Sequence, residues 1–198
     1  MKTIILASNN SHKIQEFKQI LNEYQILSLK DIGFLDDIVE DGQTFLDNAL
    51  IKARAVYDYL KQKKLNYYIV SDDSGLCVNA LNGEPGVYSA RYASEHGNNQ
   101  ANRNKLIENI KDKQDKTAYF ICTLVLMKPD GSYEHFEGKT FGRILLTEVG
   151  DNSFCYDCLF LSDDLNKTFG EASNDEKNAV SHRFRAIKKL AIALNQIK

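Results

Sequence analysis

Short apolar runs and amphipathic stretches alternate along this chain. An apolar run of about four to eight residues is typical of a buried strand, whereas apolar residues at every third or fourth position predict a helix. These patterns predict strands over residues 2–8, 25–29, 67–71, 117–127 and 132–141, and an extended segment over 76–81. Helices are predicted over about residues 14–21, 44–61 and 98–111, and from 184 onwards. The interleaved elements indicate an α/β fold.

Turn and capping residues mark several boundaries. The segment 128–131, Lys-Pro-Asp-Gly, is a hairpin signal between two predicted strands, so we expect the sheet to be mixed. Thr44 is suited to cap the helix that follows, because Asp47 stands three residues later, where its carboxylate can bond back to the cap. The acidic stretch before this helix, residues 36–41, is loop-like.

The C-terminal segment opens with a second capping box, Ser173 with Glu176. Ser181 is itself a good N-cap, so we expect a helix break there. His182 and Arg183 would then lie at the start of a second helix. The alternative is one continuous helix with a solvated basic face.

Composition excludes several classes of partner. The 198 residues include 25 Lys plus Arg and 27 Asp plus Glu, a balance that argues against a nucleic acid polymer as partner. Every apolar run is far shorter than the roughly 18 residues of a membrane helix, so we expect no membrane partner. The N-terminal apolar run is too short for a secretory signal, which predicts a cytoplasmic protein with reduced thiols. We see no interdomain linker and expect one domain over residues 1–198.

The four cysteines do not predict a zinc site. Cys155 and Cys158 form one C-x-x-C pair, but structural zinc needs two further ligands at suitable spacing. Cys77 and Cys122 are isolated in apolar surroundings. We therefore expect no bound zinc.

The segment between the first strand and the first helix is rich in small polar residues. It reads Ser8-Asn9-Asn10-Ser11-His12-Lys13. N–H groups at a helix N-terminus attract anions, and Lys13 adds positive charge, so this is a candidate phosphate-binding loop. The alternative is an ordinary N-cap followed by a solvent lysine.

Two adjacent carboxylates, Asp72 and Asp73, follow the strand predicted at 67–71. Ligands of open α/β sheets bind beyond the carboxyl ends of strands, so this is a second candidate site. Consecutive strand residues point to opposite faces, and the two aspartates should therefore do different jobs. Carboxylate oxygens there would suit Mg²⁺. The alternative is an Asx-turn that closes the strand.

Together these segments resemble the inosine triphosphate pyrophosphatase family almost from end to end. The longest match is Asp-Asp-Ser-Gly-Leu at 72–76, followed by Leu-Asn-Gly-Glu-Pro-Gly-Val-Tyr-Ser-Ala-Arg-Tyr-Ala at 81–93. Supporting matches are Ser8-x-Asn10-x-x-Lys13, Gly42-x-Thr44-Phe45, Asn48-Ala49, Lys52-Ala53, Phe154-x-Tyr156-Asp157, Lys167-Thr168, Glu176-Lys177-Asn178 and Ser181-His182-Arg183. Their agreement in this order favours the functional interpretations over the structural alternatives above.

The resemblance implies an enzyme that hydrolyses non-standard purine nucleoside triphosphates, ITP, dITP and XTP, to the monophosphate and pyrophosphate. It implies Mg²⁺ as cofactor, held by Glu40 and Asp73, with Asp73 also as general base. A carboxylate suits that role because a bound metal lowers the pKa of its water. The implied fold is a mixed, elongated β-sheet flanked by helices, with two lobes and the active-site cleft between them. The implied assembly is a homodimer.

The resemblance also divides the substrate between two groups of residues. Those implied to bind the triphosphate are Ser8, Asn9, Asn10, Ser11, His12, Lys13, Lys52 and Ser74. Those implied to form the base pocket are Phe154, Cys155, Tyr156, Asp157, Lys177, His182 and Arg183. Donors such as His182 and Arg183 favour the 6-oxo group of inosine and xanthosine over the 6-amino group of adenine, so ATP should be rejected. Phe154 can stack on the purine.

The pocket segment departs from the family pattern Gly-Phe-Gly-Tyr-Asp-Pro. This chain has Ser153, Cys155 and Cys158 where the family has Gly, Gly and Pro. Cysteine is disfavoured at φ > 0, so the position of Phe154 depends on how residue 155 is accommodated. Oxidation of the two cysteines, which would deform the pocket, is a further hypothesis. Two alternative functions remain: a nucleotide-binding regulator with an altered base pocket and lost turnover, and a related pyrophosphatase that prefers modified pyrimidines.

Overall fold

The computed structural model describes residues 2–93, 97–151 and 154–196. Its α-helices are α1 (Ser11–Ile20), α2 (Phe45–Gln62), α3 (Asn99–Ile110), α4 (Asn174–Val180) and α5 (His182–Gln196). Its strands are β1 (Lys2–Leu6), β2 (Tyr24–Leu27), β3 (Tyr68–Val78), β4 (Thr117–Met127), β5 (Tyr133–Ile144), β6 (Phe160–Ser162) and β7 (Lys167–Thr168). Short 3-10 helices are η1 (Asn79–Leu81), η2 (Gly86–Arg91) and η3 (Asp157–Leu159). Of the described helices, none is long and apolar enough to span a membrane.

Within the described residues, seven strands form one mixed sheet in the order β2-β1-β3-β4-β5-β6-β7. β1 pairs in parallel with β2 and β3, whereas β5 with β6 and β6 with β7 pair antiparallel. The turn between β4 and β5 closes where the Lys128 N–H donates to the Ser132 carbonyl at 2.8 Å. The predicted mixed sheet and hairpin are confirmed, and the second hairpin strand extends to Ile144.

The chain divides into two compact units. Unit 1 comprises Met1–Asp73, Cys122–Gly138 and Phe184–Lys198, and unit 2 comprises Ser74–Ile121 and Lys139–Arg183. β3, β4 and β5 each contribute residues to both units. Each unit also has an apolar core of its own, because the buried clusters do not mix residues of the two.

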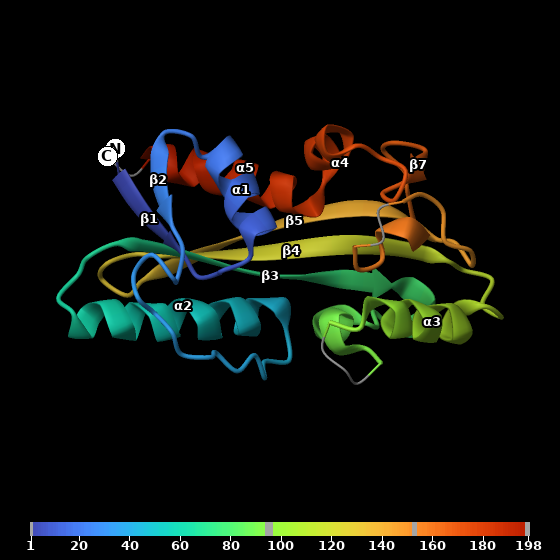
Figure 1. Cartoon of the computed structure of the whole chain (residues 1–198), viewed down its shortest axis with the longest axis horizontal. Coiled ribbons are helices and arrows are strands. Elements are labelled where there is room, and N and C mark those ends of the chain that lie inside the picture. The colour runs from blue at the N-terminus through green and yellow to red at the C-terminus, as the bar shows by residue number, and fades with distance from the viewer. Residues whose placement is uncertain (1, 94–96, 152–153, 197–198) are drawn as a thin grey trace. The chain divides into compact units, whose positions relative to one another are not determined.

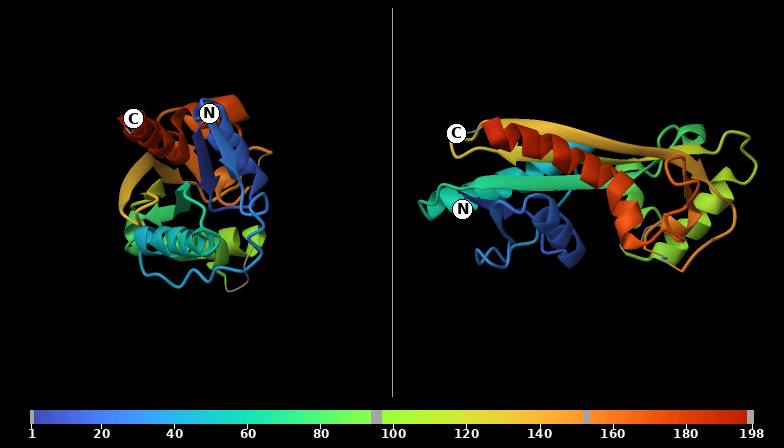
Figure 2. Two further views of the ribbon diagram at one scale, coloured as in Figure 1. Left: turned by 90° about the vertical axis from the view of Figure 1, so that its left-hand side faces the viewer. Right: turned by 90° about the horizontal axis from the view of Figure 1, so that it is seen from above.

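In unit 1 helices cover both faces of the sheet. Helix α2 lies on one face, and α1 and α5 lie on the other (Figure 1). Ile69 belongs to the buried cluster on the α2 face, whereas the next residue, Val70, belongs to the cluster on the α1 and α5 face. Figure 2 shows α5 lying along β5, where the Lys189 ammonium donates to the Glu137 carbonyl at 2.7 Å. Consecutive residues of β3 therefore serve opposite layers.

Unit 2 is built around aromatic side chains. The ring centroid of Phe120 lies 4.7 Å from that of Phe160 and 6.0 Å from that of Phe169. Such ring pairs contribute roughly 0.5–1.5 kcal/mol beyond the area they bury. Tyr156 and Leu159 join the same buried cluster, so the segment around residue 156 is anchored in the core of this unit.

Strand β3 is longer than predicted, because it does not end before the two aspartates. It runs from Tyr68 to Val78 and includes Asp72 and Asp73. The strand lies between β1 and β4, and Asp72 is almost completely buried. Buried backbone must pair its N–H and C=O groups, and neighbouring strands supply those partners. The predicted strand end at residue 71 and the Asx-turn alternative are therefore wrong, and the extended segment ends at Val78, before η1.

The predicted helix break at Ser181 is confirmed. Helix α4 ends at Val180, Ser181 has extended φ and ψ of −65° and 152°, and α5 begins at His182. The alternative of one continuous helix is therefore wrong. The capping boxes that begin α2 and α4 also form as predicted.

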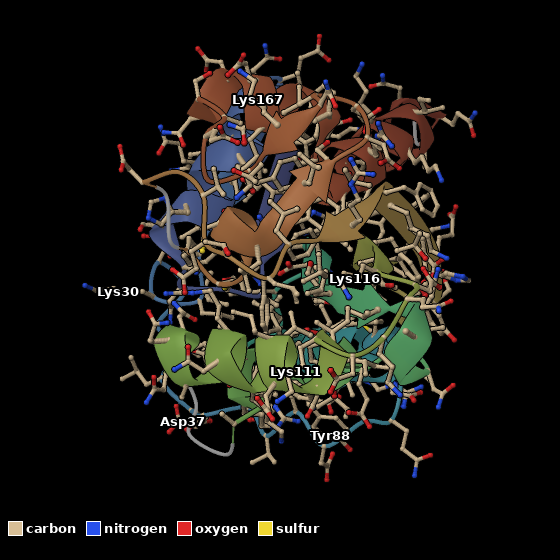
Figure 3. All side chains as sticks on the ribbon, turned by 90° about the vertical axis from the view of Figure 1, so that its right-hand side faces the viewer. Lys30, Asp37, Tyr88, Lys111, Lys116 and Lys167 are labelled. Carbon is tan, nitrogen blue, oxygen red and sulfur yellow. The ribbon has the colours of Figure 1, made fainter. Side chains whose placement is uncertain are left out.

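Glu176 stabilises the start of α4 through two contacts. Its carboxylate accepts from the Ser173 N–H at 2.9 Å and lies 2.6 Å from the ammonium of Lys167, which Figure 3 labels. The bond from Lys167, followed by those from Ser173, lowers the pKa of Glu176 from 4.5 to about 2. A group whose pKa is lowered by folding stabilises the protein above its unfolded pKa, and this stability is lost as the pH falls toward the folded value.

We therefore expect Glu176→Gln to lower the free energy of unfolding at neutral pH and to flatten its fall between pH 4.5 and pH 2. Urea unfolding at several pH values measures both effects. Asp175→Asn removes the same charge from the same helical turn and is the matched control. An equally steep fall in the wild type and in Glu176→Gln would contradict the prediction.

Candidate functional site

Asp72 and Asp73 have partners on opposite faces of β3. The Lys13 ammonium lies 2.9 Å from the Asp72 carboxylate, whose side chain is 1% exposed. The side-chain amide of Asn48 donates to Asp73 Oδ2 at 3.0 Å. Lys13 belongs to α1 and Asn48 to α2, the helices that cover the two faces of the sheet in unit 1 (Figure 1). The two carboxylates therefore have different surroundings, as their adjacency in a strand predicts.

The loop before α1 is ordered by its own polar side chains. Asn10 is the N-cap, and its Oδ1 accepts from the Lys13 N–H at 3.2 Å. Ser8 Oγ accepts from the Asn10 N–H at 3.1 Å. The exposed residues of the loop are Asn9, Asn10, Ser11 and His12. The N-cap alternative is right about Asn10, but it is wrong about Lys13, whose ammonium is held at Asp72.

Lys52 is a buried lysine that contacts one carboxylate and interacts electrostatically with two more. Its ammonium lies 2.6 Å from Glu40 Oε2, and its side chain is 10% exposed. Burial alone would lower the pKa of Lys52, but Asp72, Asp73 and Glu40 outweigh burial and raise this pKa. Lys52 therefore stays charged and holds the loop that carries Glu40 near the acidic pair.

The surroundings of Asp73 disfavour its charged form, and its neighbours only partly offset this effect. Burial raises the pKa of Asp73, and Glu40 and Asp72 add to the rise, whereas Lys52 and the amide of Asn48 oppose it. Three carboxylates, Glu40, Asp72 and Asp73, outnumber the two lysines that neutralise them, Lys13 and Lys52, so a net negative charge remains at this place. An added cation would relieve the repulsion.

The donor set fits Mg²⁺. This ion takes oxygen ligands, and one or two protein carboxylates suffice because waters and substrate phosphates complete its shell. Glu40 and Asp73 supply two such carboxylates. In the described ranges no group of three or more His, Cys, Asp or Glu is placed to hold a metal alone. The arrangement suits a metal that is shared with the phosphates of a substrate.

Asn48 contacts the site although its sequence position predicts no role. Its Oδ1 accepts from the Gly42 N–H at 2.8 Å, which turns its amide nitrogen toward Asp73. A Cβ at Gly42 would lie 2.7 Å from Asn48 Oδ1, so this approach requires glycine. Gly42 and Asn48 both belong to the matched motifs, but their spacing does not reveal the bond, because it depends on how the loop enters α2.

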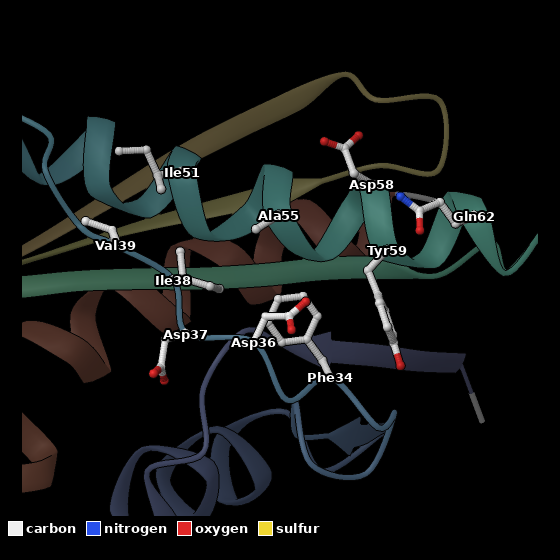
Figure 4. A pocket seen from close by; sticks show the side chains of 10 residues that line it. All are labelled: Phe34, Asp36, Asp37, Ile38, Val39, Ile51, Ala55, Asp58, Tyr59 and Gln62. Carbon is white, nitrogen blue, oxygen red and sulfur yellow. The ribbon is translucent and has the colours of Figure 1, made fainter.

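A hollow of about 330 Å³ in unit 1 lies between α2 and the loop that precedes Glu40. Figure 4 shows its lining, with side chains of the loop on one side and of α2 on the other. Asp36, Asp37 and Asp58 belong to that lining. These carboxylates would repel a triphosphate, so we do not assign the hollow to the phosphates.

In unit 2, residues 154–157 form a tight turn. The Asp157 N–H donates to the Phe154 carbonyl at 3.1 Å. Cys155 has φ of 49°, so the cysteine adopts the positive φ expected of the glycine that the family has here. Tyr156 is buried, and its hydroxyl donates to the Ser89 carbonyl at 2.8 Å. Cys155 therefore replaces glycine without a change in the sign of φ at this position. Ser153 lies outside the described residues.

Lys177 connects this turn to α4. Its ammonium forms a short ion pair with Asp157, which is buried. The same ammonium lies 5.8 Å from the ring centroid of Phe154 and 5.6 Å from that of Phe169. Phe154 is 51% exposed. Unit 2 thus brings Phe154, Asp157 and Lys177 together, and an exposed ring beside a fixed cation suits a flat heterocycle.

His182 is packed into the core of unit 2. Its ring stacks on Phe120, with centroids 5.1 Å apart and an interplanar angle of 16°. Arg183 and Ser74 are half-buried. The structure therefore gives His182 a packing role, and the roles of His182, Arg183 and Ser74 toward a substrate stay predictions.

The four cysteines, Cys77, Cys122, Cys155 and Cys158, all carry thiols. Burial raises the pKa of the Cys158 thiol to about 11. The thiolate is the form that reacts in oxidation and exchange, so this cysteine is a poor nucleophile at neutral pH. The hypothesis that oxidation of the C-x-x-C pair deforms the pocket stays a prediction.

A side chain at positive φ costs about 1 kcal/mol or more. We therefore expect Cys155→Gly to raise the free energy of unfolding by up to about 1 kcal/mol, which corresponds to roughly 2–4 °C in Tm for a chain of this size. Cys155→Ala is the control, because it removes the sulfur but keeps the β-carbon, and it should give no gain. Equal gains in thermal unfolding for both variants would contradict backbone strain as the cause.

Known proteins resemble this chain over nearly its whole length. It matches the model of the Ham1 family over residues 4–193. It is 47% identical to the dITP/XTP pyrophosphatase of Clostridium perfringens and 43% identical to that of Bacillus subtilis, each over 195 residues and 96% of both chains. The solved structure of the Staphylococcus aureus Ham1 protein aligns with a TM-score of 0.89 at 39% identity over 100% of both chains.

A second solved structure, the nucleoside-triphosphatase or dITP/XTP pyrophosphatase of Mycobacterium abscessus, aligns with a TM-score of 0.78. Its sequence is 38% identical, and the alignment covers 95% of this chain and 98% of that one. These matches confirm the resemblance that the motifs indicate, since they extend over the segments that carry those motifs. The chain belongs to the Ham1 family.

Proposed function

We propose that this chain hydrolyses non-standard purine nucleoside triphosphates, ITP, dITP and XTP, to the monophosphate and pyrophosphate. The observation that carries the proposal is the set of partners around Asp73 in unit 1: the Asn48 amide, the Lys52 ammonium and the Glu40 carboxylate. Relatives at 47% and 43% identity are named dITP/XTP pyrophosphatase, which supports the same substrates here.

Hydrolysis at the α-phosphorus needs an activated water and a stabilised pyrophosphate leaving group. We assign the acceptance of the water proton to Asp73. Its buried position raises its pKa, which makes the carboxylate a better proton acceptor. The bond from Asn48 fixes the orientation of the carboxylate, so the acceptor is positioned before the substrate arrives.

The triphosphate is assigned to the 8–13 loop with Lys13, Lys52 and Ser74. Lys13 and Lys52 are already held by carboxylates, at 2.9 Å and 2.6 Å. Cations that are ordered before binding lose little side-chain entropy when a phosphate joins them.

We assign the purine base to Phe154 and Lys177. Cys155, Tyr156 and Asp157 form the turn that supports them, and His182 and Arg183 complete the proposed base pocket. Phe154 offers an exposed ring for stacking, and the ion pair with Asp157 fixes Lys177 next to it. A fixed N–H donor favours the 6-oxo group of inosine and xanthosine, and it leaves the amino group of adenine facing another donor.

We propose Mg²⁺ as cofactor, held by Glu40 and Asp73. When bound, it would neutralise phosphate charge and lower the pKa of a bound water. The excess of negative charge around Lys52 supports this assignment. We also propose that residues 1–198 act as one pyrophosphatase domain, in the cytoplasm and as a homodimer, on the strength of the family resemblance.

Pyrophosphate release from ITP, XTP, dITP, ATP, GTP and a modified pyrimidine triphosphate tests the activity. We expect turnover of ITP, XTP and dITP, and little turnover of ATP. Asp73→Asn should lower kcat by about 10³-fold, within the range expected for loss of a general base. Asp58→Asn, an exposed aspartate on α2, is the matched control and should keep full activity.

The outcomes separate the alternatives. No turnover of ITP would defeat the proposal, and nucleotide binding without turnover would favour the regulator. Equal turnover of ATP would defeat the specificity claim. Preference for the modified pyrimidine would favour the related pyrophosphatase.

Removal of Mg²⁺ by a chelator should abolish turnover, and added Mg²⁺ should restore it. Glu40→Gln should raise the Mg²⁺ concentration for half-maximal activity by roughly tenfold or more, because loss of even an indirect metal partner weakens binding by 10–100-fold. Asp41→Asn, the exposed neighbour, is the control. An unchanged Mg²⁺ requirement in Glu40→Gln would remove Glu40 from the metal site.

A further inference from the structure

We propose that Arg103 is a positioning residue for the purine site and acts through the backbone carbonyl of Cys155. The inference rests on the proposed function, in which Phe154 and Asp157 belong to the base pocket. Arg103 lies on α3 and belongs to no motif that points to a substrate. Its contacts within unit 2 carry the argument.

The geometry of the turn at 154–157 depends on the orientation of its central peptide, which joins Cys155 to Tyr156. Cys155 has φ of 49°, and Tyr156 has φ and ψ of −112° and 11°. A positive φ followed by a negative one is the pattern of a type II′ turn, whose first central position normally takes glycine. Types I′ and II′ differ in the orientation of the peptide between the two central residues. The carbonyl of Cys155 belongs to that peptide, so a bond to this oxygen fixes the direction of the peptide.

Arg103 holds this carbonyl. Its Nη1 donates to the Cys155 oxygen at 3.0 Å. Its Nε donates to Glu148 at 2.9 Å, and its Nη2 donates to Gln100 at 2.8 Å. Because the guanidinium is a rigid planar fork, two fixed contacts aim the third donor. Arg103 is 4% exposed, so its guanidinium is largely shielded from water.

Glu148 completes the arrangement. The same carboxylate oxygen also accepts from the Gln100 amide at 2.9 Å. The bond from Arg103, followed by that from Gln100, lowers the pKa of Glu148, which therefore remains ionised beside the guanidinium. Ion pairs with a solvent-accessible partner contribute little net stability, and an apolar side chain could fill the space of Arg103. What an apolar side chain cannot supply is a donor to the Cys155 carbonyl.

The bond from Arg103 to the carbonyl of residue 155 matters because this residue is a cysteine. Glycine adopts positive φ without steric cost, whereas cysteine does not, so the turn needs a contact from outside its own backbone. The two ends of the turn are Phe154, the ring assigned to stacking, and Asp157, which orients Lys177. Release of the carbonyl would move both of them.

The test is a double-mutant cycle on ligand binding, measured by calorimetry in the Asp73→Asn background so that turnover does not enter. The variants are Arg103→Met, Cys155→Gly and the two combined, and the ligands are ITP and inorganic tripolyphosphate, each with Mg²⁺. Arg103→Met should weaken ITP binding about tenfold, the effect of one lost hydrogen bond in a buried setting. Tripolyphosphate has no base, so its Kd should change less than about twofold. With Cys155→Gly also present, the effect of Arg103→Met on ITP should fall to about threefold or less, because glycine holds the turn unaided.

Two further variants guard the interpretation. Glu148→Gln keeps Arg103 but neutralises its partner, and it should weaken ITP binding in the same direction by about threefold even if Arg103→Met does not fold. Lys111→Met removes an exposed charge next to the C-terminal end of α3 (Figure 3) and should change neither Kd. Equal losses for ITP and tripolyphosphate, or an Arg103→Met effect of the same size with and without Cys155→Gly, would overturn the inference. Coupling in binding without ITP turnover by the wild type would uphold the inference and defeat the proposed hydrolysis, whereas turnover without coupling would defeat the inference alone.

Discussion

The candidate site depends on the burial of two adjacent carboxylates in an interior strand of the sheet. Because β3 lies between β1 and β4, its side chains alternate between two layers of helices, and Asp72 and Asp73 face different ones. A buried carboxylate needs a hydrogen-bond donor or a cation nearby. Lys13 meets this need on the α1 face, and Asn48 meets it on the α2 face. The start of α1 is therefore linked to Asp72, and the start of α2 is linked to Asp73.

The need to pair buried charges also explains the ion pairs of unit 1. Lys52 is buried, and it remains charged because its interactions with Asp72, Asp73 and Glu40 together outweigh its desolvation. Its ion pair with Glu40 ties an otherwise exposed loop to the strand. Lys52, which could bind phosphate, is therefore ordered in advance by Glu40, which could bind a metal, and Lys13 is ordered by Asp72.

Unit 2 is constrained by backbone conformation rather than by charge alone. The family pattern places glycine at position 155, and cysteine is disfavoured at the positive φ that glycine tolerates, so the sequence raises the question of how this position is accommodated. The structure answers that the cysteine keeps the glycine conformation. Its carbonyl is held by Arg103, 52 positions away along the chain. No local pattern could have identified this contact, because Arg103 reaches the Cys155 carbonyl only when α3 packs beside the turn.

Local chemistry in the sequence determined the order of the longer elements, the capping boxes at Thr44 and Ser173, and the helix break at Ser181, but it did not predict the short strands β6 and β7. These features depend on side chains within one turn of each other, so hydrophobic periodicity and capping rules suffice to predict them. Tertiary structure alone decided that β3 continues through Asp73, that Asn48 meets Asp73 from 25 positions away, and that His182 stacks on Phe120. Such contacts join residues far apart in the chain, and their geometry follows from how helices and strands pack, which no local pattern specifies.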